Sequence, residues 1–373
     1  MLSYIEISKE NLLHNFDSIK SIVKPGTKIA AVIKANAYGH GQNEIAQILE
    51  DKVDYFQIDD ARELNELRKV TKKPILVLGY VAIQEMEKAL QNEGIFSVYD
   101  IEQIIKFNEA ANKLNKKAEV HVKIDACLGR QGVLLDSIQE IINVLKESKN
   151  LEVKGIYSHF ANIEDTADFS HAQKQINTFE KALDIFKENG FKNLETHISA
   201  SSGIMVWESE KGNSSIVRAG IGLYGMWPSE ELKERFGDII ELKPVMRWVT
   251  HVAQVKTLPA NYSIGYGLTH ITSEPTRVAI IPQGYSDGYD RGFSSTGEVL
   301  IQNTRCKVLG RVAMNMFVVD VNHLENINME DEVVLLGKQG RENITAEEMA
   351  EKIGTINYEI TTRVLGVLPK VVK

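Results

Sequence analysis

Residues 32–41 read Val-Ile-Lys-Ala-Asn-Ala-Tyr-Gly-His-Gly, with one lysine directly after the apolar run 29–33. A lysine at the carboxyl end of a buried strand is partly desolvated, which lowers its pKa and makes its amine available to attack a carbonyl. The two glycines permit a sharp loop, in which Tyr38 and His40 can direct donors at an anion. The alternative is a lysine that only extends from a strand end into water. We therefore predict a reactive Lys34 at a strand end, followed by a polar, glycine-hinged loop.

Strand-like runs alternate with amphipathic stretches from residue 28 to residue 225. The helical patterns include 43–51, 61–69, 101–114 and 169–189. Eight strand–helix units over about 200 residues are typical of a (β/α)8 barrel. A doubly wound sheet usually has fewer strands and a glycine fingerprint after the first one, which is missing here. The expected strands are 28–35, 55–58, 74–79, 95–100, 119–126, 153–160, 195–201 and 215–225.

The pattern changes after residue 242, where alternating strands dominate and one helix is expected at 346–353. Such a run predicts an antiparallel β domain of about 130 residues, to which the run 4–7 adds a strand. We therefore expect an α/β protein in which 10–240 form a (β/α)8 TIM barrel, and 1–9 with 241–373 form a mainly antiparallel β domain. The strands expected after residue 242 are 249–256, 277–281, 298–301, 307–312, 317–321 and 332–336.

Composition narrows the class of protein. The chain has 373 residues and a net charge of −8, with acidic and basic residues interspersed, which disfavours nucleic acid or an anionic membrane as a partner. The two cysteines, Cys127 and Cys306, fit a reducing compartment. The first residues lack the basic and apolar pattern of a signal peptide, and no uncharged apolar run approaches a membrane span. These features predict a soluble cytoplasmic protein.

Polar residues gather where the barrel strands are expected to end, which is where such barrels carry their reactive groups. The segment 218–225 holds an arginine and several glycines, whose open amides suit a phosphate after strands seven and eight or, equally, a tight turn. A lysine for imine formation, a phosphate site and a neighbouring arginine together indicate pyridoxal 5′-phosphate. No metal is expected. The residues at this mouth are Lys34, Tyr38, Lys123, Asp125, Arg130, His159, Ser201, Ser202, Arg218, Gly220 and Ile221.

Nine motifs make the chain resemble the alanine racemases, a family of fold type III pyridoxal phosphate enzymes, over essentially its full length. Their order and spacing also match, which is more specific than any single motif. The resemblance implies an isomerase that interconverts L- and D-alanine and supplies D-alanine for peptidoglycan. The motifs are KANAYGHG at 34–41, KIDACLGR at 123–130, SHFA at 158–161, VRAGIGLYG at 217–225, LKPVM at 242–246, IGYGLT at 264–269, IPQGYSDGYDR at 281–291, GRVAMNM at 310–316 and INYEI at 356–360.

The resemblance implies a two-base mechanism. Lys34 would hold the cofactor as an internal aldimine and act as the base for the D-enantiomer, while Tyr266 would be the base on the opposite face. Racemisation needs a group on each side of the α-carbon, because one removes a proton and the other returns one. A free tyrosine has a pKa of about 10, so its phenolate needs help, for which His159 and Arg218 are the candidates. Without the resemblance, Tyr266 reads as a turn aromatic between two glycines.

The other roles also come from the resemblance. Arg218 would face the pyridine nitrogen and keep it unprotonated, which makes the ring a weaker electron sink. Arg130 would bind the phenolic oxygen of the cofactor and the substrate carboxylate, helped by the amide of Met314. Lys123 matches a lysine that is often carbamylated, and the resulting anion would orient Arg130. The cofactor-binding set is Lys34, Tyr38, His159, Ser201, Arg218, Gly220, Ile221 and Tyr358, of which Tyr38, Ser201, Gly220, Ile221 and Tyr358 would hold the phosphate.

Family members are homodimers with shared active sites, so Tyr266 and Met314 would act in the partner's barrel. Tyr285, Tyr289 and Arg291 would then line the entry corridor, or Tyr289 and Arg291 would belong to an ordinary interface cluster.

Departures from the usual family sequence at 126–128, 200–202 and 310–316 leave the preferred substrate open. A serine or broad-specificity racemase is the first alternative. A basic amino acid decarboxylase with this barrel would normally have a carboxylate in place of Arg218. A non-catalytic pyridoxal phosphate carrier would lack the β domain that this chain carries.

Overall fold

The computed structural model describes residues 1–373 and divides into two compact units. The barrel unit comprises 13–35 and 45–243, and the β-rich unit comprises 1–12, 36–44 and 244–373. No helix of the chain is both long enough and apolar enough to cross a membrane.

The barrel unit contains the eight predicted strands, all paired in parallel in the order β8-β7-β6-β5-β4-β3-β2-β9. The first and last strands of this order are linked by the bond from Arg218 N to Ser199 O, at 3.1 Å, so the barrel is nearly closed. The strands are β2 (Lys28–Val32), β3 (Tyr55–Ile58), β4 (Ile75–Val77), β5 (Gly94–Val98), β6 (Ala118–Lys123), β7 (Leu151–Tyr157), β8 (Glu195–His197) and β9 (Ile216–Ala219).

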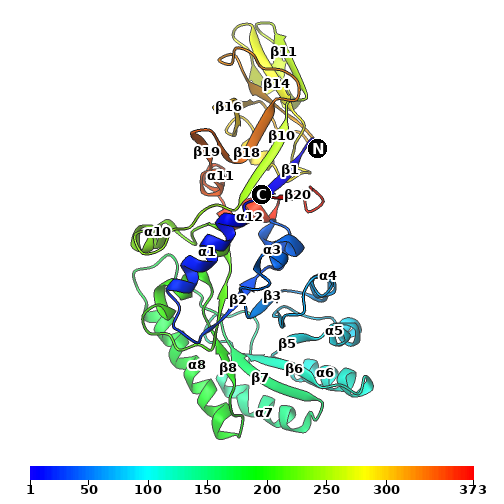
Figure 1. Cartoon of the computed structure of the whole chain (residues 1–373), viewed down its shortest axis with the longest axis vertical. Helices are drawn as coiled ribbons and strands as arrows, with labels where there is room; N and C mark the ends of the chain where they lie inside the picture. The colour runs from blue at the N-terminus through cyan, green and yellow to red at the C-terminus, as the bar shows by residue number, and fades with distance from the viewer. The chain divides into compact units, whose positions relative to one another are not determined.

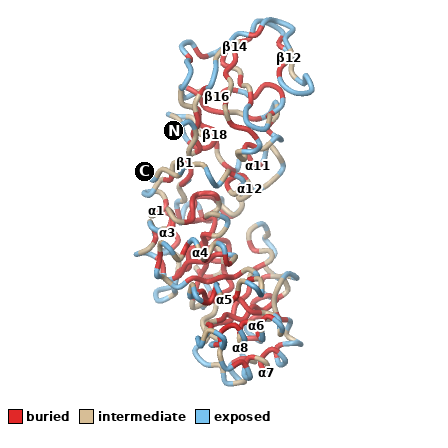
Figure 2. The backbone as a smooth tube through the Cα atoms, turned by 90° about the vertical axis from the view of Figure 1, so that its right-hand side faces the viewer, coloured by how far each residue is buried: buried red, intermediate tan, exposed pale blue.

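Helices follow the strands and surround them (Figure 1). Their starts are set locally: the Asp60 carboxylate accepts hydrogen bonds from the amides of Arg62 and Glu63, and Asp100 caps its helix in the same way. One face of each helix is buried against the strands, which are themselves mostly buried (Figure 2). The helices of the barrel unit are α4 (Ala61–Leu67), α5 (Met86–Gln91), α6 (Ile101–Lys113), α7 (Ile138–Glu147), α8 (Ser170–Glu188), the short α9 (Ser201–Gly203) and α10 (Glu230–Phe236).

The barrel interior is partly polar. His121 Nδ1 lies 2.9 Å from His197 Nε2, and the Tyr157 ring stacks on the His197 ring with centroids 4.7 Å apart. The Tyr157 hydroxyl lies 2.6 Å from Ser97 Oγ. All four side chains are buried. Burial lowers the pKa of His121 to about 4, so this pair is neutral at neutral pH.

The β-rich unit is built on one long sheet of order β11-β14-β17-β16-β15-β18-β10-β1-β20, with β19 paired to β18. The predicted N-terminal strand is confirmed as β1 (Tyr4–Ile7), which pairs antiparallel with β10 and parallel with β20. The other strands are β10 (Met246–His251), β11 (Gln254–Leu258), β12 (Ser263–Ile264), β13 (His270–Ile271), β14 (Thr276–Ile281), β15 (Glu298–Ile301), β16 (Thr304–Leu309), β17 (Phe317–Asp320), β18 (Glu332–Gln339), β19 (Glu342–Ile344) and β20 (Lys370–Val372).

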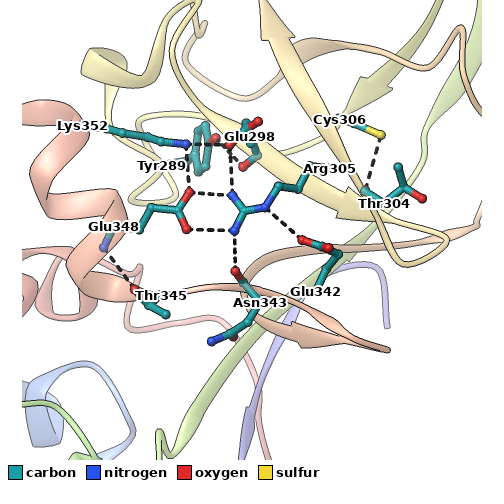
Figure 3. A network of polar contacts seen from close by, with 10 residues as sticks. All are labelled: Tyr289, Glu298, Thr304, Arg305, Cys306, Glu342, Asn343, Thr345, Glu348 and Lys352. Carbon is teal, nitrogen blue, oxygen red and sulfur yellow. Dashed lines mark hydrogen bonds and ion pairs between the residues drawn. The ribbon is translucent and has the colours of Figure 1, made fainter.

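Two helices complete the β-rich unit, α11 (Ala346–Ile353) and α12 (Asn357–Thr362). An ion-pair network links α11 to the sheet (Figure 3). The guanidinium of Arg305 contacts the carboxylates of Glu298, Glu342 and Glu348 at 2.6–3.1 Å, and Lys352 contacts Glu298 at 2.8 Å. Residues of both units occur in α1 (Lys9–Ser21), α2 (Lys34–Tyr38) and α3 (Gln42–Leu49).

Candidate active site

Lys34 lies two residues beyond the end of β2, as the strand-end prediction requires. The predicted glycine hinge is present, because Gly39 and Gly41 have φ of 87° and 100°, but the residues between Lys34 and Gly39 do not form an open loop. Residues 35–38 all have φ between 51° and 55°, so α2 is a short left-handed turn built from residues other than glycine. This conformation costs an L-residue roughly 1–2 kcal/mol. Four consecutive residues in this conformation directly after Lys34 mark a segment that its surroundings hold in place.

Arg218 is buried and held from several sides. Its Nη2 atom donates hydrogen bonds to Ser158 O at 2.8 Å and to Ile198 O at 2.7 Å, and it lies 3.2 Å from His159 Nδ1. Burial, followed by the Arg218 charge, keeps the pKa of His159 well below its usual value. The imidazole is therefore neutral, and its Nδ1 accepts from the guanidinium, which keeps its own proton.

Lys123 is the last residue of β6 and is buried at the same mouth. Desolvation lowers its pKa to about 7, and the charges of Arg130 and Arg218 act in the same direction. The Lys123 ammonium therefore loses its proton far more readily near neutral pH than an ordinary lysine does. Its Nζ lies 5.5 Å from the centre of the Tyr157 ring, and the Arg218 guanidinium lies 5.6 Å from that ring centre.

Arg130 is exposed on a tight loop after β6. The Asp125 carboxylate closes this loop by accepting hydrogen bonds from the amides of Leu128 and Gly129 at 2.9 and 3.0 Å. Cys127 in the same loop has a φ of 63°, a backbone conformation that is unfavourable for residues other than glycine. The positive charge of Arg130 acts on both Lys123 and His159.

The structure also brings together the serine and the glycines that were expected at the phosphate. Ser201 Oγ, at the start of α9, accepts hydrogen bonds from the amides of Gly220 and Gly222 at 3.0 and 3.3 Å. Ile221 lies between these glycines and is buried. Ser202 is the next residue of α9 and is also buried.

The remaining site residues belong to the β-rich unit, where two tyrosines lie together. The rings of Tyr38 and Tyr358 are 6.1 Å apart. Close to them in the sequence, Gly39 has a φ of 87°, and a Cβ added there would lie 2.0 Å from Thr361 O. Only glycine fits this close backbone approach.

Tyr266 lies on an exposed turn between β12 and β13, and 72% of its surface is accessible. Glycines with φ of 72° and 73° flank it, as the sequence suggested. Met314 lies on a second exposed loop. Its carbonyl oxygen accepts hydrogen bonds from the amide and the hydroxyl of Ser286 at 3.0 and 2.8 Å.

The three residues expected along an entry corridor differ in exposure. Tyr285 is exposed, and so is Arg291. Tyr289, in contrast, is fully buried in the core of the β-rich unit, where its ring stacks on Phe317 with centroids 4.5 Å apart. The structure therefore does not support a corridor role for Tyr289; its aromatic ring is part of the core packing.

Two acidic residues at the barrel mouth were not predicted. Asp59 follows β3, and its Oδ1 lies 3.8 Å from Lys34 Nζ. Glu63 accepts hydrogen bonds from the amides of Ala35 and Asp59 at 2.6 and 2.8 Å. A sequence signal existed for Glu63, because the pattern Asp60-x-x-Glu63 resembles a capping box. Nothing in the sequence pattern marks Asp59 as a neighbour of Lys34.

Comparison with known proteins places the chain in a family. Residues 7–228 match the family described as "Alanine racemase, N-terminal domain", and residues 245–372 match "Alanine racemase, C-terminal domain". The alanine racemase of Carboxydothermus hydrogenoformans is 38% identical over 370 residues, which cover 99% of this chain and 98% of that protein. The alanine racemase of Methanococcus maripaludis is 37% identical, with 99% and 98% covered.

Solved structures agree over the whole chain. The alanine racemase of Clostridium difficile 630 superposes with a TM-score of 0.92 at 35% identity, covering 100% of this chain and 96% of that one. The alanine racemase of Bacillus anthracis with bound L-Ala-P gives a TM-score of 0.93 at 29% identity, covering 100% and 95%. Sequence and fold thus agree along the full length, and this chain belongs to the alanine racemase family of isomerases.

Proposed function

We propose that this chain binds pyridoxal 5′-phosphate through Lys34 and interconverts L- and D-alanine with Lys34 and Tyr266 as its two bases. The observation that carries the proposal is the charge at the barrel mouth. Four cations, those of Lys34, Lys123, Arg130 and Arg218, act together on His159. Such a group of like charges favours anionic ligands.

The residues at this mouth fit the proposed cofactor. Its phosphate and phenolic oxygen and the substrate carboxylate are anionic, and each finds a cation or a donor among the mouth residues. Ser201 with the amides around Gly220 suits the phosphate, as we infer from their mutual hydrogen bonds. Arg218 would face the pyridine nitrogen, where a permanently protonated guanidinium suits an unprotonated ring nitrogen. The assignment of Tyr38 and Tyr358 to the phosphate stays a prediction from the resemblance.

When bound, the cofactor would supply an electron-withdrawing system that acidifies the substrate α-carbon. The Nζ of Lys34 would take or return the α-proton on one face, and the phenolic oxygen of Tyr266 would do so on the other. The neutral His159 and the Arg218 guanidinium keep the hydrogen bond between them at 3.2 Å without competing for a proton. Arg130 and the Met314 amide would hold the substrate carboxylate.

The test of this proposal combines a spectrum with a mapped label. Protein incubated with pyridoxal phosphate should gain an absorbance band near the visible edge that disappears on borohydride reduction, and the label should map to the peptide with Lys34. Lys34→Ala should lose both the band and racemisation. Lys52→Ala, at an exposed lysine of the barrel unit, is the matched control. A label on another peptide would overturn the mechanism.

Two other functions are separated by simple assays. The departures from the family sequence at 310–316 motivate a serine or broad-specificity racemase as an alternative. The assay compares the turnover of both enantiomers of alanine, serine and lysine. Higher catalytic efficiency with serine or lysine would remove alanine from the proposal. A non-catalytic cofactor carrier would be indifferent to Tyr266→Phe. A two-base racemase should lose most of its racemisation activity in both directions.

We further propose that the chain works as a cytoplasmic homodimer and supplies D-alanine for peptidoglycan. Support for the dimer comes from the β-rich unit, which exposes several large apolar side chains between residues 262 and 316. Two of these loops are joined by the bonds of Ser286 to Met314 O. Complementation of a strain that requires D-alanine would test the physiological role. The exposed side chains are Tyr262, Tyr266, Leu268, Ile271, Tyr285, Met314 and Met316.

A further inference from the structure

We propose that Asp59 is a further functional residue of this site, in which its carboxylate accepts a proton from the Lys34 ammonium when that amine becomes linked to an aldehyde. We infer in addition that Glu63 positions both residues. The inference rests on the proposed function, because it takes Lys34 to be the residue that carries the cofactor.

The first observation is the contact itself. Asp59 Oδ1 lies 3.8 Å from Lys34 Nζ, and Asp59 is the one carboxylate in ion-pair range of that amine. About half of each side chain is exposed, with 41% accessible for Lys34 and 57% for Asp59. An exposed pair of this kind adds little to stability. The contact instead places a carboxylate beside the amine that we propose to react.

The second observation is that the backbone on both sides of the contact is fixed by one carboxylate. Glu63 Oε1 accepts from Ala35 N at 2.6 Å, directly after Lys34, and Glu63 Oε2 accepts from Asp59 N at 2.8 Å. Burial raises the pKa of Glu63, although these two amide bonds oppose the rise. One side chain thus sets the spacing between the strand end that carries Lys34 and the strand end that carries Asp59.

A third observation concerns the space beside Asp59. Gly79 N donates to Asp59 O at 2.9 Å, and a Cβ added at Gly79 would lie 2.8 Å from the Asp59 carboxyl carbon. The Asp59 side chain therefore occupies room that only glycine leaves open. On this side, the Asp59 side chain packs against Gly79, which follows β4.

The charges around the pair explain why an acceptor is useful. The Asp59 charge raises the pKa of Tyr99 and Glu63, and the Lys34 charge lowers the pKa of Lys123 and His159. Two neighbouring cations of the mouth, Arg130 and Arg218, cannot accept a proton, because a guanidinium stays protonated and has no acceptor atom. An ammonium has no lone pair and must lose a proton before it attacks. Asp59 is the neighbouring base that is placed to take it.

The step balances as follows. The Lys34 ammonium passes one proton to the Asp59 carboxylate and becomes an amine. The nitrogen lone pair forms a bond to the aldehyde carbon, and one nitrogen proton moves to the former carbonyl oxygen. Asp59 then returns its proton to that oxygen, which leaves as water, while the nitrogen keeps one hydrogen in a positively charged C=N link. Asp59 ends as a carboxylate, and no oxidant or metal is consumed.

The experiment follows the loading of cofactor-free protein with pyridoxal phosphate by absorbance, and maps the borohydride-reduced label. We expect Asp59→Asn to slow loading by about 10²-fold, a typical effect of losing general acid–base help. The label should still form on Lys34. Asp59→Glu should recover part of the rate. Asp17→Asn, which removes the same charge from an exposed position on α1, should load like the unmodified protein.

A small carboxylate separates a chemical role from a structural one. Added formate should speed the loading of Asp59→Ala in proportion to its concentration, and should not affect Asp17→Ala. Glu63→Gln should slow loading less than Asp59→Asn and should gain nothing from formate. Equal loading of Asp59→Asn and Asp17→Asn would overturn this inference and leave the proposed function standing. Absence of a Lys34 label in the unmodified protein would instead overturn the proposed function.

Discussion

Lys123 shows how a single residue acquires unusual chemistry from its surroundings. It is buried at a strand end and faces the charges of Arg130 and Arg218, so its pKa falls to about 7. An uncharged amine can add carbon dioxide and release a proton, which would replace one cation of a crowded group by an anion. The environment thus favours the carbamate that the family resemblance implies, and the resulting anion would lie where it can pair with Arg130.

We predict a carbamate on Lys123. Protein equilibrated with ¹³C-bicarbonate should give one carbamate signal in its ¹³C spectrum, and Lys123→Met should lose that signal. We expect the variant to lose roughly 10²-fold in kcat/KM, because Arg130 is no longer oriented. Lys52→Met is the control and should behave like the unmodified protein. A spectrum without the signal at saturating bicarbonate would rule the modification out.

Individual residues also show where sequence reasoning stops. Lys34, His159 and Arg218 were predictable, because parallel strands bring their carboxyl ends to one mouth. Asp59 was not, since its contact with Lys34 depends on the spacing between two strand ends. Core burial was not among the roles considered for Tyr289, because a motif tyrosine looks the same in sequence whether it lines a surface or fills a core.

At the scale of elements, hydrophobic alternation located all eight barrel strands and the helix at 346–353, and these predictions are confirmed. The pattern failed where pairing is distant in sequence. β20 pairs in parallel with β1, at the other end of the chain, and periodicity carries no information on partners. It also failed at residues 35–38, because their left-handed turn contains no glycine and so has no sequence signal.

The packing of β7 against β6 and β8 gives a prediction for one glycine. A Cβ at Gly155 would lie 2.6 Å from His121 Cε1 and 2.7 Å from Glu195 O. His121 is fully buried and cannot move aside. Gly155→Ala should therefore destabilise the barrel by about 1–3 kcal/mol, measured by chemical denaturation. Gly366→Ala, with its nearest neighbour at 3.7 Å, is the control; equal midpoints for the two variants would contradict the prediction.

The ion-pair network of Arg305 gives a second prediction at this scale (Figure 3). Two parallel bonds join its guanidinium to Glu348, and the third nitrogen contacts Glu342. A lysine cannot form these parallel bonds, so Arg305→Lys should lower the free energy of unfolding of the β-rich unit by about 2 kcal/mol. Faster hydrogen exchange of the β15 and β16 amides is the measurement. Arg341→Lys, at an exposed arginine of the same unit, should leave that exchange unchanged.

At the scale of the whole molecule, both units contain fully buried histidines, which are His121 and His197 in the barrel and His40 in the β-rich unit. Burial lowers the pKa of His121 and of His40 to about 4, and it keeps the pKa of His197 well below its usual value. The unfolded chain binds these protons below about pH 6.5 and the folded chain does not, so stability is complete above that pH and falls as the pH drops toward 4.

His121 and His40 should therefore each lower the free energy of unfolding by about 2 kcal/mol between pH 7 and pH 5. Denaturation midpoints at several pH values measure the loss. The ring-proton NMR shifts of His121 and His40 in the folded protein should stay constant down to pH 5. Midpoints that rise on acidification would show that other groups dominate.

The sharing of active sites between subunits is the last property of the whole molecule that can be measured directly. Lys34→Ala removes one base and Tyr266→Phe removes the other, so each variant alone should lose racemisation in both directions. If Tyr266 acts in the partner's barrel, a mixed dimer contains one site with both changes and one site with neither.

Unfolding the two variants together and refolding them at equal concentration should therefore restore activity to about a quarter of that of the unmodified protein, since half of the dimers are mixed and each has one intact site. Each variant refolded alone is the control. If both bases came from one subunit, every site in a mixed dimer would carry one change, and mixing would restore nothing. The yield of activity thus distinguishes a shared site from two independent ones without any knowledge of the interface.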